Sequence, residues 1–243
     1  MIASIPQICR DPLVRFAISL PLVTSTAVAD GLVIDKIYDP YVQPLEKEIE
    51  ARLLIQSDDS IADVKKHSLG FGRSIGERWF TEIYAIGLRT TGESLRVDTY
   101  ALEVKRQLTE QGEYSFDWGL LFELEREADV NVWEFSTSVI ASREIGRWVA
   151  TANFDLIYES GDSVTNEFET ALHTQLRHRW SESFEPGLEA HVGQDTLAAG
   201  PVVSGLKRIG VGAKFLWEVG YFVGLDRPTP DNTLRLIFEY EFF

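Results

Sequence analysis

Residues 233–243, TLRLIFEYEFF, end the chain and decide its fold class. Successive side chains of an extended strand point to opposite faces. One face of this stretch is therefore apolar or aromatic from Leu234 to Phe242, whereas the other carries Thr233, Arg235 and Glu239. A soluble protein buries such a face in its core, and a membrane barrel turns it toward lipid. The rest of the chain has to decide between the two.

The same alternation of polar and apolar residues recurs through the chain, with no helical period between the segments. Twelve strands are predicted, at 48–56, 68–76, 79–90, 95–107, 113–125, 131–142, 147–159, 166–179, 184–194, 206–214, 217–225 and 233–243. Asp98 falls on the apolar side of the fourth strand, which indicates a bulge or a loop there. Most segments are long enough for a tilted membrane crossing, which takes about 9–11 residues.

The first 29 residues have the three parts of a secretory signal peptide in order. Arg10 and Arg15 form a basic region, 16–23 (FAISLPLV) is an apolar run, and 27–29 (AVA) is a small-residue cleavage site. The apolar run is too short to span a bilayer as a helix, which takes about 20 residues. A buried N-terminal helix is the less favoured alternative. We expect cleavage after residue 29.

Export divides the chain into a signal peptide (1–29), a periplasmic N-terminal segment (30–47) and a barrel (48–243). The only cysteine, Cys9, leaves with the leader, so the mature chain has no disulfide and no thiolate metal site. The leader also removes two arginines and one aspartate, which changes the net charge from −15 to −16. Binding to nucleic acid needs clustered Lys and Arg, and the sequence contains no such cluster. We therefore expect no nucleic-acid partner and no cofactor.

The connections between the predicted strands alternate between tight and longer ones, except that the connection after the third strand is also short. The tight connections are 76–78, 109–112, 143–146, 181–183 and 215–216. An up-and-down barrel with two unlike ends has such a pattern, with short turns on the periplasmic side. Because the strand number is even, both ends of the barrel chain should lie on that side.

All six tryptophans fall on the apolar faces of the predicted strands. Five gather at the rim of the tight turns: Trp79, Trp118, Trp148, Trp180 and Trp217. Trp133 falls at the opposite rim. Amphipathic rings favour the membrane interface, and aromatic girdles are typical of membrane barrels. A soluble sandwich has no reason to collect tryptophan at one end, so the membrane barrel is favoured.

With its leader, strand repeat and aromatic ending, the mature chain resembles porin-like outer-membrane β-barrels of Gram-negative bacteria over its whole length. Phe238, Tyr240 and Phe242 are similar to the C-terminal signal read by the barrel-assembly machinery, although Phe243 follows the usual last position. The size, the acidity and residues 38–42 (YDPYV) resemble exported barrels of the phenol-degradation (MetA-pathway) type. The resemblance implies an outer-membrane location, with outer-membrane lipid and the barrel-assembly machinery as partners.

The polar faces of the strands would line the interior of such a barrel. The candidate lumen-lining residues are Glu82, Glu123, Glu134, Asp155, Glu169, Arg177 and Glu189. Rings of carboxylates favour cations, whereas mixed rows of charge can close an interior with ion pairs. Both arrangements remain open.

Two histidines are candidates for a metal site in the interior. A hairpin centred on Glu182 would place His173 opposite His191, beside Glu169 and Glu189. Imidazole is a good ligand for copper, zinc and nickel. The alternative is that both rings form hydrogen bonds within a polar lumen.

The sequence therefore predicts an all-β protein, a transmembrane up-and-down antiparallel β-barrel of about 12 strands. We expect a small porin-like channel for small solutes, cations among them. An outer-membrane enzyme acting on lipid or lipopolysaccharide and a closed structural barrel are the alternatives. An enzyme of that kind needs a nucleophile and a base within reach of each other. His67 and Ser68 would point to opposite faces of a strand, so no catalytic residue is predicted.

Overall fold

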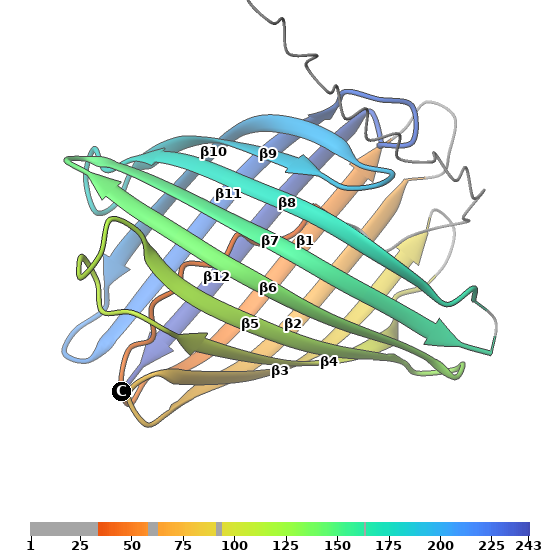
Figure 1. Cartoon of the computed structure of the whole chain (residues 1–243), viewed down its shortest axis with the longest axis horizontal. Helices are drawn as coiled ribbons and strands as arrows, with labels where there is room; N and C mark the ends of the chain where they lie inside the picture. Colours follow the sequence, from red (N-terminus) through yellow and green to blue (C-terminus); the bar gives the residue numbers. More distant parts are fainter. Residues whose placement is uncertain (1–33, 58–62, 91–93, 163) are drawn as a thin grey trace, which may run out of the picture. The chain divides into compact units, whose positions relative to one another are not determined.

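The computed structural model describes residues 34–57, 63–90, 94–162 and 164–243. Within these ranges twelve antiparallel strands close into a barrel, in which each strand pairs with its sequence neighbours and β1 pairs with β12 (Figure 1). The strands are β1 (Lys47–Ser57), β2 (Val64–Ile75), β3 (Trp79–Thr90), β4 (Arg96–Gln107), β5 (Asp117–Glu127), β6 (Val132–Ile145), β7 (Trp148–Gly161), β8 (Glu167–His178), β9 (Glu185–Val192), β10 (Leu197–Arg208), β11 (Ala213–Gly224) and β12 (Asn232–Phe242). In the same ranges, no helix is long and apolar enough to cross a membrane. The predicted signal peptide lies outside the described residues.

The barrel is apolar outside and largely polar inside. On β3, Ile83 is 57 % exposed and its neighbour Glu82 is 3 % exposed. On β1, Ile49 is exposed and Glu50 is buried in the same way. A transmembrane barrel shows this arrangement, because lipid covers the outer residues and the lumen takes the polar ones. The predicted fold class is confirmed. The apolar faces of the strands point outward, where lipid can cover them, and do not pack against a second sheet.

The two ends of the barrel are distinguished here by the chain termini. We call the end where β1 begins and β12 ends the C-terminal rim, and the opposite end the loop rim. The connections at the C-terminal rim are 76–78, 108–116, 146–147, 179–184 and 209–212. Because 108–116 is longer than 128–131 or 193–196 at the loop rim, the predicted alternation in connection length is wrong.

Residues 113–116 of the 108–116 connection were predicted to begin the fifth strand, because Tyr114 and Phe116 alternate with polar residues. Side chains instead hold it as a loop. Thr109 Oγ1 accepts the N–H of Trp118 at 2.9 Å, and Asp117 Oδ1 accepts the N–H of Gly112 at 2.8 Å. Local side-chain bonds of this kind compete with the strand ladder.

The tenth strand is β10 (Leu197–Arg208) rather than the predicted 206–214, which moves the following turn to 209–212. Its first half lacks polar alternation and contains Gly200 and a proline, which indicated a loop. The glycine is needed where it is, because a Cβ there would lie 1.8 Å from the carbonyl oxygen of Tyr221. Because the close approach of two backbones requires a glycine here, the sequence pattern indicated a loop where the structure has a strand.

The bulge expected near Asp98 is present. The register between β3 and β4 shifts between Ile86 and Gly87, which leaves Asp98 outside the pairing. The Asp98 carboxylate accepts the N–H of Leu88 at 2.6 Å. The side chain of the extra residue therefore supplies the acceptor for a backbone N–H of the neighbouring strand.

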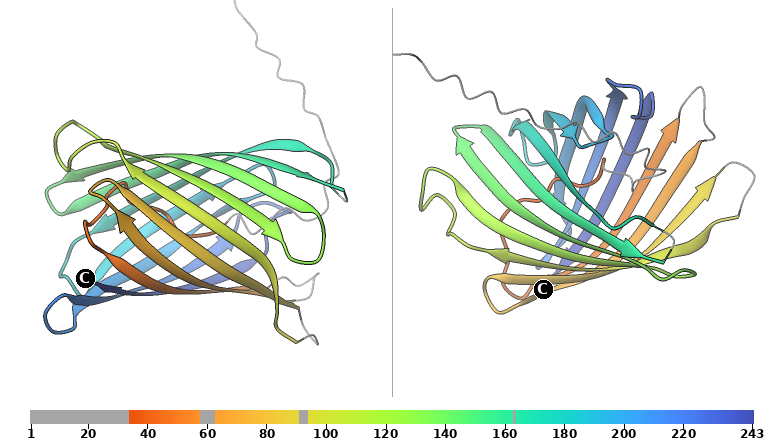
Figure 2. Two further views of the ribbon diagram at one scale, coloured as in Figure 1. Left: turned by 90° about the horizontal axis from the view of Figure 1, so that it is seen from below. Right: turned by 45° about the vertical axis from the view of Figure 1, so that its right-hand side comes forward.

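The chain before β1 lies inside the barrel, as the red trace shows in both views of Figure 2. We call residues 34–46 the lumen segment. The prediction had placed 30–47 in the periplasm, and this is wrong for the part that the structure describes. The local sequence pattern does not indicate that the segment lies inside the barrel, because the residues that hold it there belong to distant strands.

Candidate functional site

The lumen segment runs from one rim of the barrel to the other. Ile34 packs in a buried cluster with Ala198 and Phe222, near the loop rim. At the other end the carbonyl oxygen of Glu46 accepts the N–H of Ser74 at 2.8 Å, near the C-terminal rim. The segment therefore occupies the interior along its length.

Tyr38 joins opposite walls of the barrel. Asn153 of β7 accepts the N–H of Tyr38 at 2.7 Å and donates to the Tyr38 carbonyl oxygen at 2.9 Å. The Tyr38 hydroxyl donates to the Glu103 carboxylate of β4 at 2.8 Å and accepts from Arg52 of β1 at 2.8 Å. The paired amide bonds imitate a strand ladder, so the wall binds the backbone of the segment as well as its side chains.

The charged residues of the lumen segment are paired with the wall. Lys36 Nζ lies 2.5 Å from Glu50 and 2.6 Å from Glu239. The Asp35 carboxylate lies 2.9 Å from Arg52 and 3.3 Å from Lys66. Ion pairs away from bulk water are stronger than exposed ones but also cost more to desolvate. These pairs fix the position of the segment.

The middle of the lumen segment is fitted against β4 and β5. A Cβ on Gly119 would lie 3.0 Å from Pro40, so the glycine leaves room for the proline ring. The Tyr41 hydroxyl donates to Asp117 at 2.7 Å, and the N–H of Val42 donates to Gln107 at 2.8 Å. The wall and the segment are therefore matched in shape and in hydrogen bonding.

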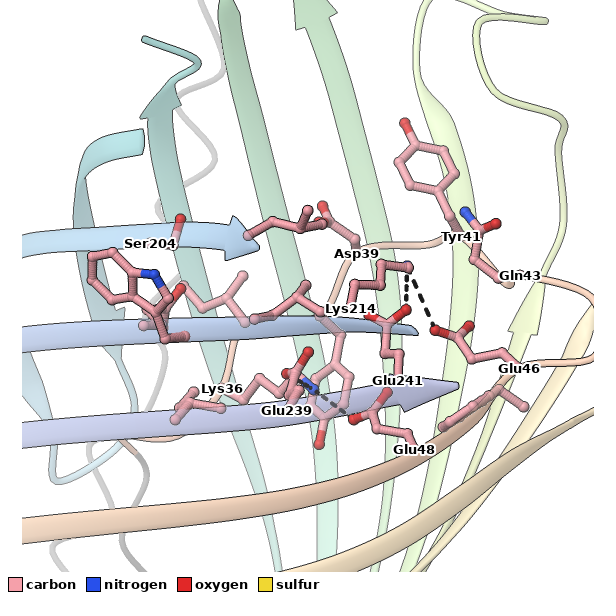
Figure 3. Close-up of a pocket in the computed structure, with 18 of the residues that line it drawn as sticks. Lys36, Asp39, Tyr41, Gln43, Glu46, Glu48, Ser204, Lys214, Glu239 and Glu241 are labelled. Atoms are coloured by element: carbon pink, nitrogen blue, oxygen red, sulfur yellow. Dashed lines mark ion pairs between the residues drawn. The ribbon is translucent and has the colours of Figure 1, made fainter. Parts of the chain in front are cut away.

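A cavity of about 440 Å³ lies between the lumen segment and the wall, toward the C-terminal rim. Ten carboxylates and five cationic side chains line it. Figure 3 shows Lys36 beside Glu239, and Lys214 between Glu241 and Glu46. The acidic side chains exceed the cationic ones twofold, so the lining of the cavity is predominantly acidic.

Arg235 of β12 is the largest side chain that is completely buried, at 1 % exposure. Its Nη2 lies 2.6 Å from Glu189 and 2.6 Å from Glu218, and its Nη1 donates to the carbonyl oxygen of Asp35. The guanidinium carbon lies 4.9 Å from the centre of the Phe222 ring. The sequence placed Arg235 on the inner face but contained no sign that it joins two strands to the lumen segment.

The predicted hairpin register of β8 and β9 is confirmed, with His173 opposite His191 and Gln175 opposite Glu189. The two Nδ1 atoms are 2.9 Å apart. His191 Nε2 lies 3.2 Å from Glu189, as expected. The sequence had placed Glu169 beside the pair, and the carboxylate bonded to His173 Nε2, at 2.9 Å, is Asp155.

The remaining candidate lumen residues lie in the inward register of their strands. Glu82 and Glu189 are buried, and the half-buried ones are Glu123, Glu134, Asp155, Glu169 and Arg177. Glu82 and Arg177 line the cavity. Two triplets of carboxylates also approach one another, Glu46–Glu48–Glu241 and Glu48–Glu50–Glu239, and lysines already pair with both.

No family model and no curated protein matches the chain. Solved structures match its fold. An outer membrane channel from Pseudomonas putida F1 has 12% identity and a TM-score of 0.57, with 84% of this chain and 97% of that chain covered. The NanC porin has 8% identity and a TM-score of 0.54, over 80% and 99% of the two chains. The KdgM porin in complex with disordered oligogalacturonate has 12% identity and a TM-score of 0.52, over 81% and 98%.

This chain has the β-barrel fold of outer-membrane porins and channels. The three matched structures are named as a channel and two porins rather than as enzymes. Within the barrel, Ser68 is buried on the inner face of β2, and its neighbour His67 is half-buried in the opposite register. The two residues do not form a dyad.

The tryptophans lie at different distances from the C-terminal rim. Trp79, Trp118 and Trp148 are exposed at the first or second residue of their strands at the C-terminal rim. Trp180 is exposed in the 179–184 connection at the same rim. Trp217 is half-buried and stands further into its strand, because β11 begins at residue 213 rather than at the predicted 217.

We expect variants that retain one tryptophan to report this difference in depth. Trp148 alone should be quenched more by lipids brominated near the head group, because aromatic rings at the end of a strand lie at the interface. Trp217 alone should be quenched more by lipids brominated deep in the chain. Fluorescence in vesicles measures both. Equal quenching profiles would show that the two residues do not lie at different depths.

The C-terminal aromatic residues face outward. Phe238 and Tyr240 are exposed, and the Tyr240 and Phe242 rings are stacked with their centres 5.7 Å apart. The N–H of Phe243 donates to the carbonyl oxygen of Gly212 at 3.1 Å, so the extra residue is bonded to the 209–212 turn. Recognition of this ending by the barrel-assembly machinery stays a prediction.

Proposed function

We propose that the protein is a narrow outer-membrane channel that prefers small cations. The observation that carries this proposal is the cavity of about 440 Å³, lined by ten carboxylates and five cationic side chains. Rings of acidic side chains concentrate cations and repel anions at the mouth of a pore. The excess of carboxylates inside the barrel therefore supports selectivity for cations.

The packing of the interior supports a narrow pore. Toward the loop rim, a cavity of only about 10 Å³ lies beside Asp35, Arg52 and Arg235. This volume is about that of a single water molecule. The packing beside the lumen segment is therefore tight at this position, and we expect a solute to move the segment or to pass beside it together with water.

The solute class is argued from this interior rather than from the matched porins. One of these contains oligogalacturonate, a chain of sugar carboxylates. An interior with twice as many carboxylates as cations is poorly suited to such an anion, because like charges repel. The interior here fits a small cationic solute or an inorganic cation better.

Single-channel recording in a planar bilayer under a potassium chloride gradient tests the proposal. Wild-type protein should give small discrete steps and a reversal potential on the cation side. Glu185→Gln should move the reversal potential toward zero, because Glu185 lines the cavity and its carboxylate is paired with Arg177 at 3.3 Å. Glu110→Gln is the matched control, since Glu110 is an exposed glutamate in the 108–116 connection.

Two outcomes contradict the proposed function. An anion-biased reversal potential would contradict selectivity for cations. The absence of discrete steps over a wide range of voltage and salt would favour a closed structural barrel.

A further inference from the structure

The two histidines that face each other inside the barrel are held by carboxylates on their outer sides. His173 Nε2 lies 2.9 Å from Asp155 of β7, and His191 Nε2 lies 3.2 Å from Glu189 of β9. An ionised carboxylate only accepts hydrogen bonds. Each Nε2 therefore carries the hydrogen and donates it, which fixes the tautomer of both rings.

Both carboxylates accept hydrogen bonds from further donors. Glu189 accepts from Arg235 at 2.6 Å and from Gln175 at 2.6 Å. Asp155 accepts from the hydroxyl of Ser138 on β6. These bonds hold the carboxylate oxygens in position beside the two rings. Side chains from several strands therefore prearrange the outer side of each imidazole.

The inner sides of the rings present an unusual arrangement. With hydrogen on each Nε2, both Nδ1 atoms are acceptors, and they face each other at 2.9 Å. Two lone pairs at this distance repel unless a cation lies between them, either a shared proton or a metal ion. His191 is fully buried and His173 is nearly so, and bulk water therefore cannot solvate the two lone pairs.

We propose that His173 and His191 form a binding site for a divalent transition-metal ion of the copper or zinc class, bound through their Nδ1 atoms. Imidazole nitrogen is a preferred ligand of these ions. In known sites, a histidine ligand usually donates its other ring N–H to a carboxylate, which orients the ring. Asp155 and Glu189 occupy this position on both rings.

The geometry needs little change to accept the ion. A tetrahedral ion with metal–nitrogen bonds of about 2.0–2.1 Å holds two nitrogens roughly 3.3 Å apart. The present separation of 2.9 Å would widen by a few tenths of an ångström. A change of this size needs only small rotations of the two rings.

The surrounding charge also favours a cation. Asp155, Glu189 and Glu218 are the carboxylates of this network, and Arg235 is its one cationic side chain among the described residues. The Phe222 ring stands edge-on to His191 with the ring centres 5.0 Å apart, and so limits movement of the imidazole. The site does not depend on the proposed channel activity, because it is formed by the barrel wall.

The test uses the folded barrel in detergent with any affinity tag removed, because a histidine tag would add imidazoles. Calorimetric titration with Cu²⁺ and with Zn²⁺ should show one saturable site. The electron paramagnetic resonance spectrum of the copper form should show coupling to two equivalent nitrogens. Circular dichroism of each variant checks that the barrel has folded.

Three variants separate ligands from neighbours. His173→Gln should abolish saturable binding and the two-nitrogen coupling. Asp155→Asn should weaken binding by about 10–100-fold, as is typical of a residue that orients a ligand. His178→Gln is the matched control, since His178 packs against Trp148 away from the pair, and it should bind like wild type.

The proposal is overturned if wild type shows no saturable site for either ion, which would mean that a shared proton holds the pair together. It is also overturned if His173→Gln binds as tightly as wild type. The two-nitrogen spectrum of wild type remains decisive even if one variant fails to fold.

Discussion

Deletion of residues 34–44 should raise the single-channel conductance of the barrel several-fold. The lumen segment occupies the interior from the Ile34 cluster to the C-terminal rim, and the free volume beside Asp35 is about that of one water. Without the segment, Glu50 and Arg52 would face water, which solvates them readily. The strand ladder does not include the segment, so the barrel should still fold.

A disulfide lock tests the same idea without removing residues. The mature chain has no cysteine, because Cys9 belongs to the predicted leader. In a Pro40→Cys/Gly119→Cys variant, the two side chains meet where a Cβ on residue 119 lies 3.0 Å from Pro40. Cβ atoms of disulfides are about 3.5–4.5 Å apart, so a shift of less than about 1 Å suffices. The oxidised variant should conduct less than the reduced one.

The single variant Pro40→Cys is the control for the lock, and oxidant should leave its conductance unchanged. If the deletion conducts like wild type, and the double variant is indifferent to oxidation, the lumen segment does not limit the current. The narrow part of the pore would then lie among the inward side chains of the wall.

The wall of the barrel could be predicted from the sequence because neighbouring residues within each strand determine which face is polar and which is apolar. Polar and apolar residues alternate from Leu234 to Phe242 and in most other strands, so the outer and inner faces follow from parity alone. The His173–His191 register also followed, because a tight hairpin determines every pair above it. The prediction failed at Gly200, where a close backbone contact requires a residue that is typical of loops.

The interior could not be predicted because its contacts join distant residues. Tyr38 bonds to Asn153 over 115 positions, and Asp35 bonds to Arg235 over 200. The periodicity of residues 34–46 carries no trace of these partners. The alternation of residues predicts that Asp155, which bonds to His173, faces the interior. It does not predict how the strand of Asp155 is aligned with the strand of His173. The candidate site is therefore less predictable than the fold.

Replacing Arg235 with methionine should be the most destabilising single change in the barrel wall. The side chain is 1 % exposed and pairs with both Glu189 and Glu218. Removal of one partner from a buried ion pair costs about 3–5 kcal/mol, because the other charge stays buried and unpaired. Here two carboxylates lose their partner. The free energy of unfolding in urea, measured in lipid vesicles by tryptophan fluorescence, should fall by at least this amount.

Arg208→Met is the matched control, because Arg208 also belongs to an arginine–glutamate pair. Both partners of that pair, Arg208 and Glu182, have side chains that are 69% exposed. Exposed pairs contribute about 0–1 kcal/mol, so this variant should unfold near the wild-type urea concentration. Adding Glu218→Gln to Arg235→Met should recover part of the loss, since it removes one unpaired charge. Equal losses in the free energy of unfolding for Arg235→Met and Arg208→Met would contradict a stabilising buried network. A much larger loss for Arg235→Met, partly recovered by Glu218→Gln, would show that the residues that bind Asp35 in the lumen also stabilise the wall.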